Sequence, residues 1–142
     1  MLDSSYIVGL VDGEGSFTVY VKNLNDSNER KRRVRIEPKF YVKFVEKDKD
    51  ILYQLQRYFD CGKVYFQKDR RKNHQDCYRY EVFNRIDLVE KIIPFFKKNK
   101  PKLASKQKDF ELFCKLIHII GRKEHLTVKG MQKIYKIKQQ MH

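Results

Sequence analysis

The sequence is poor in cysteine and has no long apolar run. Its three cysteines, Cys61, Cys77 and Cys114, are odd in number and show no C-x-x-C spacing, which argues against a disulfide framework and against a zinc ribbon. No apolar run approaches the roughly 18 residues that a membrane helix needs, and the N-terminus has no basic signal region. We therefore expect reduced thiols in an intracellular protein that is neither secreted nor inserted into a membrane.

Acidic residues are also scarce relative to basic ones. Lys and Arg number 32 against 18 Asp and Glu, which gives a formal net charge of +14. This balance argues against an acidic cofactor carrier or a neutral metabolic enzyme, and it predicts a polyanionic partner. With 41% hydrophobic residues, 6 Gly and 3 Pro, the chain has the composition of a globular protein. Its 142 residues predict one domain over residues 1–142.

The periodicity of apolar residues alternates between helix and strand and predicts an α+β fold. The expected order is αββαββα followed by further C-terminal helices, with one face of a four-stranded sheet packed on the helices. Capping residues are expected at Asp3, Asp48, Asp87 and Thr127. The predicted strands cover residues 16–22, 34–44, 63–67 and 78–83. Pro38 predicts an edge position or a bulge in the second of them.

The other face of the predicted sheet is polar on every strand. On one strand such side chains are usually only solvated, but their recurrence on four strands, at this net charge, predicts a face that binds nucleic acid. The residues are Tyr20, Lys22, Arg35, Lys39, Tyr41, Lys43, Lys63, Tyr65, Gln67 and Arg79, with Glu37 and Glu81 among them.

Residues 7–17, Ile-Val-Gly-Leu-Val-Asp-Gly-Glu-Gly-Ser-Phe, resemble the signature of the LAGLIDADG homing endonucleases. An EF-hand loop counted from Asp12 is a poorer interpretation, because Phe17 stands where its glycine belongs and Asn23 where its bidentate glutamate belongs. Further segments resemble single-motif members associated with mobile introns, namely 35–42, 61–64, 80–82, 92–96 and 103–110. The resemblance implies an intron-encoded, site-specific hydrolase of double-stranded DNA that has a saddle-shaped antiparallel sheet and acts on a long, roughly palindromic target.

The motif also predicts a dimer and a metal site. Gly9 and Gly13 lie on one helix face, so a second copy of the helix can approach closely, with Ile7 and Leu10 beside this seam. The Glu14 carboxylate and the Gly13 carbonyl are then placed near a two-fold axis. Such oxygen ligands suit Mg²⁺, with Mn²⁺ as a plausible substitute and Ca²⁺ expected to bind without efficient cleavage. We expect no small-molecule substrate and no membrane partner.

The resemblance implies roles for particular residues. The last acid of the motif, which is the metal ligand in the family, is Glu14, and the basic active-site residue falls on Lys106, with Lys108 as its nearest competitor. Asp12 is expected to be structural. The expected DNA-binding residues are Ser16, Thr18, Tyr20, Lys22, Arg35, Glu37, Lys39, Tyr41, Lys43, Tyr65, Gln67, Arg70, Arg71, Arg79 and Glu81.

Two kinds of DNA contact are expected from the basic residues and Gln67. Arg35, Lys39, Gln67 and Arg79 are the best candidates for donors to base edges. Phosphate contacts are expected from Lys31, Arg70, Arg71 and Lys98. Strands of about ten residues span about 33 Å, so each copy would cover roughly ten base pairs and a homodimer roughly twenty. The cellular site would be the cytoplasm, the nucleoid or an organelle.

Two positions depart from the family pattern. Phe44 stands where relatives commonly carry a water-ordering glutamine, and Asp48 stands where some carry an arginine. Three alternatives remain open: Lys43, Lys47 or Lys49 takes over this task, metal and phosphate order the water, or activity is reduced. The alternative function is a non-cleaving RNA maturase or DNA-binding protein on the same scaffold. An unrelated RNA-binding protein is more remote, as is a metal cluster of Cys61, His74 and Cys77.

Overall fold

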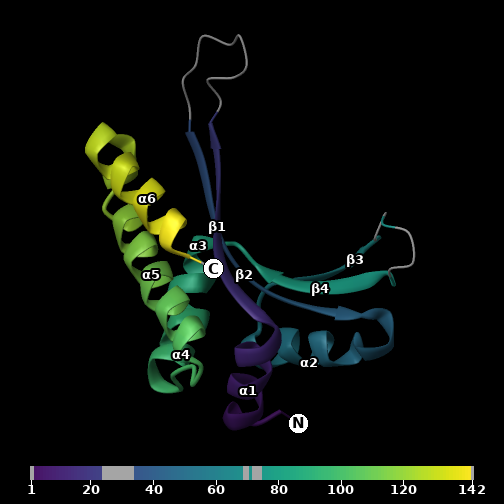
Figure 1. Ribbon diagram of the computed structural model, residues 1–142. Helices are drawn as coiled ribbons and strands as arrows, with labels where there is room; N and C mark the ends of the chain where they lie inside the picture. Colours follow the sequence, from purple (N-terminus) through teal and green to yellow (C-terminus); the bar gives the residue numbers. More distant parts are fainter. Residues whose placement is uncertain (1, 24–33, 69–70, 72–74, 142) are drawn as a thin grey trace.

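The computed structural model describes residues 2–23, 34–68, 71 and 75–141 and has the predicted α+β order (Figure 1). None of the helices in these residues is long and apolar enough to cross a membrane. The helices and strands are α1 (Ser4–Glu14), β1 (Gly15–Asn23), β2 (Val34–Val45), α2 (Asp50–Phe59), β3 (Lys63–Gln67), β4 (Cys77–Val82), α3 (Arg85–Asp87), α4 (Ile93–Lys98), α5 (Ala104–Gly121) and α6 (Val128–Gln140).

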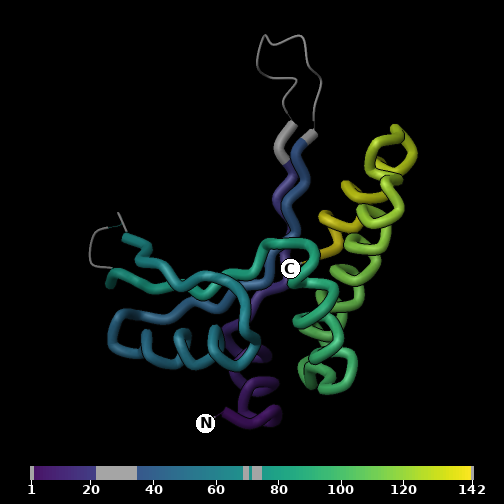
Figure 2. Tube along the Cα trace, turned by 180° about the vertical axis from the view of Figure 1, so that it is seen from behind, coloured from purple at the N-terminus to yellow at the C-terminus, as the bar shows by residue number. Residues whose placement is uncertain are grey.

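The four strands form one antiparallel sheet in the order β1-β2-β4-β3. The β1–β2 ribbon and the β4–β3 hairpin diverge, so the sheet is bent into a saddle (Figures 1 and 2). β2 has 12 residues, but β3 and β4 have 5 and 6. The expectation of about ten residues per strand is therefore wrong for this hairpin.

Pro38 lies in an interior strand without a bulge. It pairs with Val19 of β1 in a continuous register, while the pairing of β2 with β4 begins only at Phe40. At Pro38 the strand β2 thus has a neighbour on one side only. The expected edge position is correct locally, because the missing N–H of proline falls beyond the end of β4.

An aromatic core fills the space between the sheet and the helices. Phe17 of β1 is 1% exposed, and its ring centroid lies 5.1–5.5 Å from those of Phe40, Phe96, Phe110 and Phe113. These partners come from β2, α4 and α5, so a single buried side chain ties one strand to three further elements. A smaller cluster at Ile134 joins α6 to α5 and β1.

Two of the four expected helix caps are observed. The Asp3 carboxylate accepts a hydrogen bond from the amide of Tyr6 at 2.8 Å, and the Thr127 hydroxyl accepts one from the amide of Gly130 at 2.9 Å. Asp48 is not a cap: it lies in a short 3₁₀ turn over Glu46–Asp48, and α2 follows Lys49 without a side-chain cap. The extra turn at the end of β2 delays the start of the helix.

Asp87 is also not a cap, because the helical segment begins one turn earlier. Asn84 Oδ1 accepts hydrogen bonds from the amides of Ile86 and Asp87 at 2.9 and 3.2 Å. Pro94 does not end this segment. A π-helical turn over Leu88–Ile92 precedes it and widens the backbone spacing, which accommodates a ring that would otherwise meet a preceding carbonyl.

Candidate functional site

The motif helix passes directly into the first strand at Glu14. Glu14 is the exposed last residue of α1, and Gly15 is the buried first residue of β1. A Cβ on Gly15 would lie 2.9 Å from the Cα and the carbonyl oxygen of Val11, so only glycine fits this junction. The junction therefore directs the Glu14 carboxylate to solvent at the point where the sheet begins.

The start of α5 is docked on this junction. The Lys106 ammonium donates a hydrogen bond to the carbonyl oxygen of Gly15, one residue beyond Glu14. The Asp12 carboxylate accepts hydrogen bonds from the amide of Lys102, at 3.1 and 3.0 Å to its two oxygens, and from that of Leu103 at 3.4 Å. Asp12 thus has the structural contact expected of it. Lys108, the competitor of Lys106, is exposed.

The outer face of α1 is open at its glycines. A Cβ added to Gly9 or Gly13 would meet nothing within 4 Å among the described residues, and both positions are exposed. Leu10 is half-buried. Ile7 is 0% exposed because it belongs to the aromatic core, so its expected place in a dimer seam is wrong. Tyr6 instead lies on the outer face at 51% exposure, a position the glycine spacing alone did not indicate.

The donor set for a cation is incomplete in one chain. Glu14 supplies one exposed carboxylate at the junction, and its oxygen chemistry fits a hard divalent cation. Across the described part of the chain, no three His, Cys, Asp or Glu side chains gather closely enough to hold a metal ion. His74, considered with Cys61 and Cys77, lies outside the described residues.

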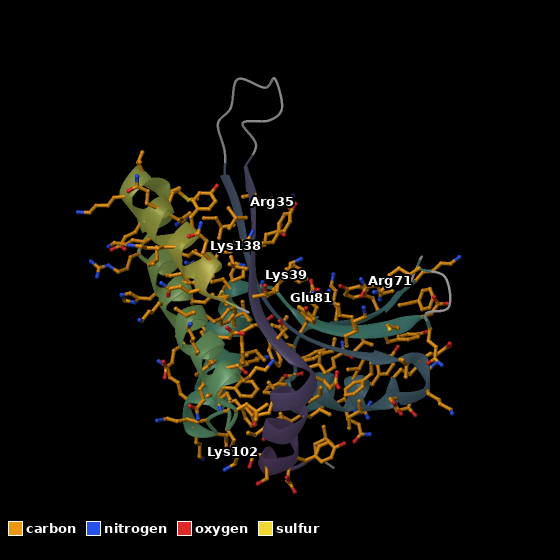
Figure 3. All side chains as sticks on the ribbon, in the orientation of Figure 1. Arg35, Lys39, Arg71, Glu81, Lys102 and Lys138 are labelled. Atoms are coloured by element: carbon orange, nitrogen blue, oxygen red, sulfur yellow. The ribbon has the colours of Figure 1, made fainter. Side chains whose placement is uncertain are left out.

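The register confirms that the predicted polar residues share one face of the sheet. Directly paired residues point to the same side, and the rows across the strands are Ser16–Tyr41–Glu81–Lys63, Thr18–Lys39, Tyr20–Glu37 and Lys43–Arg79–Tyr65. Arg35, Lys39, Glu81 and Arg71 lie along the inside of the bend (Figure 3). Gln67 is half-buried. Lys98 ends α4 on the helical side, and Lys31, Arg70 and the Lys22 side chain lie outside what the structure describes.

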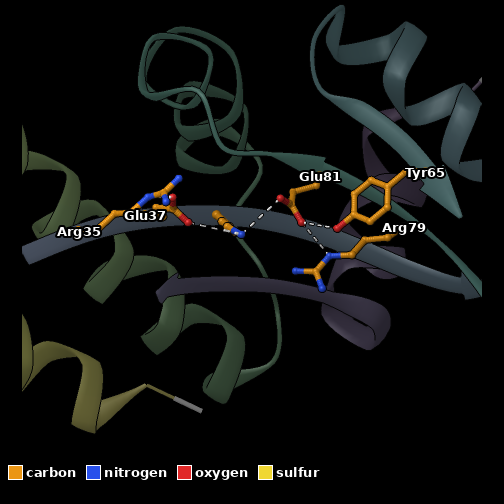
Figure 4. Close-up of polar contacts among 6 residues, drawn as sticks. Arg35, Glu37, Tyr65, Arg79 and Glu81 are labelled. Carbon is orange, nitrogen blue, oxygen red and sulfur yellow. Dashed lines mark hydrogen bonds and ion pairs between the residues drawn. The ribbon is translucent and has the colours of Figure 1, made fainter. Parts of the chain in front are cut away.

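Several of these polar side chains are already engaged with one another (Figure 4). Arg35 Nε lies 2.5 Å from Glu37 Oε1, and Lys39 Nζ lies 3.8 Å from Glu37 Oε2 and 3.6 Å from Glu81 Oε1. Arg79 Nε lies 2.9 Å from Glu81 Oε2; its N–H does not point along this line, so the contact is an ion pair without a hydrogen bond.

Glu81 differs from the rest of the polar face because it is only 7% exposed. The Tyr65 hydroxyl donates to Glu81 Oε2 at 2.8 Å, and the pKa of Tyr65 is raised, first by burial and then by this hydrogen bond. A solvated carboxylate available for direct DNA contact was expected here. The alternation of the strand indicates the face of a residue but not which neighbours close over it, so the sequence contained no signal for this burial.

The two departures from the family pattern have different surroundings. Phe44 is half-buried against the core, as its place in the apolar alternation predicts. Among the lysines considered as substitutes, Lys43 lies on the polar face opposite Arg79, Lys47 is exposed in the 3₁₀ turn, and Lys49 Nζ lies 5.1 Å from the ring centroid of Tyr78. Lys43 is the one that follows Val42, the partner of Gly15 in the sheet.

Comparison with known proteins identifies relatives over most of the chain. The sequence profile described as LAGLIDADG endonuclease matches residues 7–117. A probable intron-encoded DNA endonuclease of Mycosarcoma maydis is 39% identical over 111 residues, which cover 78% of this chain and 35% of that protein. The chain therefore spans about a third of the length of this relative.

Solved structures superpose on nearly the whole of this chain. The homing endonuclease I-TnaI superposes with a TM-score of 0.82 at 33% identity, covering 99% of this chain and 88% of that one. I-SmaMI bound to cleaved DNA superposes with a TM-score of 0.84 at 31% identity, covering 99% of this chain but 44% of that one. I-SmaMI is also known bound to an uncleaved DNA target in the presence of calcium ions.

Proposed function

Because the chain belongs to the LAGLIDADG endonuclease family, we propose that it is a homing endonuclease of the intron-encoded type that cuts both strands of a long, specific DNA site. The observation that carries this proposal is the α1–β1 junction. Glu14 carries an exposed carboxylate, the Lys106 ammonium is hydrogen-bonded to the carbonyl oxygen of the next residue, Gly15, and Ser16 opens the polar face of the sheet. The candidate catalytic residues therefore lie next to the polar face of the sheet that is the candidate DNA-binding surface.

Glu14 and Lys106 divide the proposed chemistry between them. Glu14 and the Gly13 carbonyl would hold Mg²⁺, which when bound supplies charge stabilisation for the scissile phosphate. Lys106 is kept at the junction by its hydrogen bond to Gly15. Its positive charge would therefore stabilise the scissile phosphate when DNA is bound there. That I-SmaMI holds an uncleaved target with calcium supports the expectation that Ca²⁺ permits binding without efficient cleavage.

We propose that two copies of the chain form the active particle. Gly9 and Gly13 leave the outer face of α1 free of side chains, which permits close approach of a second α1. The chain covers 44% of I-SmaMI, so two copies correspond to most of that protein. Two such copies would bring two Glu14 carboxylates to one axis, and their sheets would read a roughly palindromic site of roughly twenty base pairs.

Glu14→Gln tests the activity. The parent protein is incubated with Mg²⁺ and a supercoiled plasmid library that carries randomised inserts, and linearised plasmids are sequenced. We expect Glu14→Gln to bind the selected site with unchanged affinity but to lose cleavage, because the anionic ligand is removed while the size is kept. Glu46→Gln, with the same charge change on an exposed residue in the 3₁₀ turn that follows β2, should cut normally.

The outcomes of this experiment separate the two candidate functions. Cleavage by Glu14→Gln at the parent's rate would refute the role of Glu14. A parent that selects a DNA site but never cuts it in Mg²⁺ would instead support a non-cleaving DNA-binding protein on the same scaffold.

Gly9→Leu tests the dimer. A Cβ at this exposed position meets no atom of the described residues within 4 Å, and leucine improves helix propensity over glycine, so we expect a folded monomer. Sedimentation velocity measures the association state of both proteins, with and without the selected duplex. Gly121→Leu, at an exposed position that ends α5, is the control and should remain dimeric. A parent that binds its full site as a monomer would disprove the α1 seam.

A further inference from the structure

Glu81 is a buried carboxylate surrounded by donors on an otherwise exposed face. Its Oε2 receives the Tyr65 hydroxyl at 2.8 Å and lies 2.9 Å from Arg79 Nε, while its Oε1 lies 3.6 Å from Lys39 Nζ. Both oxygens are therefore occupied. A carboxylate in this position has little surface left for an incoming ligand, so its effect must pass through the side chains that it holds.

Arg79 is the side chain that this arrangement fixes most firmly. Its guanidinium carbon lies 3.5 Å from the ring centroid of Tyr41, and the side chain is 17% exposed. The ion pair with Glu81 attracts the guanidinium on its Nε side and the Tyr41 ring supports one flat side, so the two contacts together restrict where the guanidinium lies. The terminal nitrogens extend away from Glu81 (Figure 4), and the described residues supply no partner for them.

The neighbours of Arg79 in the sheet explain why its guanidinium needs the support of Glu81. Arg79 pairs with Lys43 of β2 on one side and with Tyr65 of β3 on the other. Like charges directly opposite each other repel, so without Glu81 the guanidinium would swing away from Lys43. Lys39 is held less firmly, since its ammonium is shared between Glu37 and Glu81 at 3.8 and 3.6 Å.

We propose that Arg79 reads a guanine in each half-site and that Glu81 is the positioning residue which fixes its orientation, with Tyr41 as the second support. Two coplanar N–H donors match the O6 and N7 acceptors that guanine presents in the major groove. The inference rests on the proposed function, because it requires DNA on the polar face. Glu81 itself contacts no base in this arrangement, in contrast to its expected role as a direct DNA contact.

Base preference measured position by position tests this assignment. The parent selects binding sites from a randomised duplex library in Ca²⁺, and every variant is then profiled on single-base changes of the selected site. We expect Arg79→Ala to lose about tenfold to a hundredfold discrimination for guanine at one base pair per half-site. Glu81→Gln should lose discrimination at the same base pair, with at most a smaller effect where Lys39, the other cation paired with Glu81, contacts DNA. Glu46→Gln, which carries the same charge change, should leave that base pair untouched.

The double variant separates positioning from direct contact. We expect Glu81→Gln to add nothing at that base pair once Arg79 is alanine, because Glu81 acts only through Arg79. A general loss of stability would weaken all sites equally and would produce no coupling confined to one base pair. Tyr41→Leu, which leaves the carboxylate intact, should weaken the same preference and provides a second variant if Glu81→Gln does not fold.

Two results would overturn the inference while leaving the proposed function standing. One is a folded Glu81→Gln or Tyr41→Leu protein that keeps the parent's full preference at the base pair sensitive to Arg79. The other is a preference that Glu81→Gln alters even in the Arg79→Ala background, which would make Glu81 a direct contact. A parent that selects no site from the library would instead remove the proposed function, and this inference with it.

Discussion

On one face of the sheet, Phe17 packs among four phenylalanine rings, whereas on the other face a single carboxylate, Glu81, gathers two cations and a hydroxyl. The first arrangement is non-directional, so any apolar side chain of the right volume adds to it. The second depends on individual donors and acceptors. The apolar face therefore supports the fold, while the polar face is free to vary in chemistry without loss of the scaffold.

This contrast explains how one sheet can combine stability with recognition. Apolar side chains of β1 and β2 are buried at Phe17, Val19, Phe40 and Val42, and Val19 lies in the segment beyond the end of β4. Polar side chains on the opposite face then contribute little to the free energy of unfolding and can be arranged for a ligand. Glu81 is the exception on that face, because it is buried and ion-paired.

Phe17→Ala should have the largest effect on the free energy of unfolding. Removing a ring that contacts four others leaves a cavity, and we expect a loss of about 3–5 kcal/mol. Tyr20→Ala, three residues along the same strand but on the polar face and 49% exposed, should change stability by about 0.5 kcal/mol or less. Urea unfolding of both variants measures the difference. Equal losses would show that the two faces contribute alike.

Arg35→Ala and Arg71→Ala should separate recognition from general affinity. Arg35 lies on the ribbon with a 66% exposed side chain, and its removal should relax the preference at one base pair by about 1–3 kcal/mol. Arg71, between β3 and β4, should weaken all sequences alike and make the salt dependence of log K shallower by about one unit per copy. Titrations of the selected site and of a scrambled duplex at several salt concentrations test both. Site-specific loss with Arg71→Ala alone would move recognition from the sheet to the loop.

Tyr80→Phe should have a small effect at neutral pH and a distinct effect at alkaline pH. The Tyr80 hydroxyl donates to the carbonyl of Cys61 at 2.9 Å, and its loss should cost about 1 kcal/mol. Burial raises the pKa of Tyr80 above its ordinary value of 10.0, so the neutral phenol stabilises the fold fully below pH 10. This stability is lost as the pH rises above 10.

Comparison with the variant isolates that alkaline effect. We expect the parent to lose unfolding free energy more steeply above pH 10 than Tyr80→Phe does. Tyr65→Phe, on the polar face and 39% exposed in the parent, should recover less of the alkaline loss than Tyr80→Phe. Unfolding free energies measured across this pH range decide the matter. Parallel curves for the parent and Tyr80→Phe would show that the phenol ionises without unfolding the core.

Much of the fold could be predicted from the sequence because its signals act over short distances. Alternation of apolar and polar residues placed Phe17 and Tyr20 on opposite faces, and the caps at Asp3 and Thr127 depend on amides three residues away. The position of Glu14 at the end of a helix was also predictable, because the glycines of the motif are its neighbours in the sequence. The motif's resemblance to a family extended this local information to Lys106, which lies far away in sequence.

The predictions that were wrong depend on how the elements pack and not on neighbours in the sequence. Asp48 has the right chemistry for a cap, but an additional turn moves the start of the helix to Asp50. Asn84 was missed because the spacing of Asp87 to Glu90 also fits a capping box, and only the packed backbone decides between the two. Ile7 was placed on the outer face of α1, but the direction in which the helix meets the sheet buries it.

The sequence by itself determined which strand residues alternate, the helix caps at Asp3 and Thr127, and the acidic residue that ends the motif helix, because each of these depends on neighbours within about one turn of helix or one pair of strand residues. Only the tertiary structure decided that Glu81 is buried between Lys39 and Arg79, and that Lys106 reaches Gly15. The physical reason is that strand order and helix docking bring together groups separated by tens of residues, and the energies of ion pairs depend on their final distances and burial.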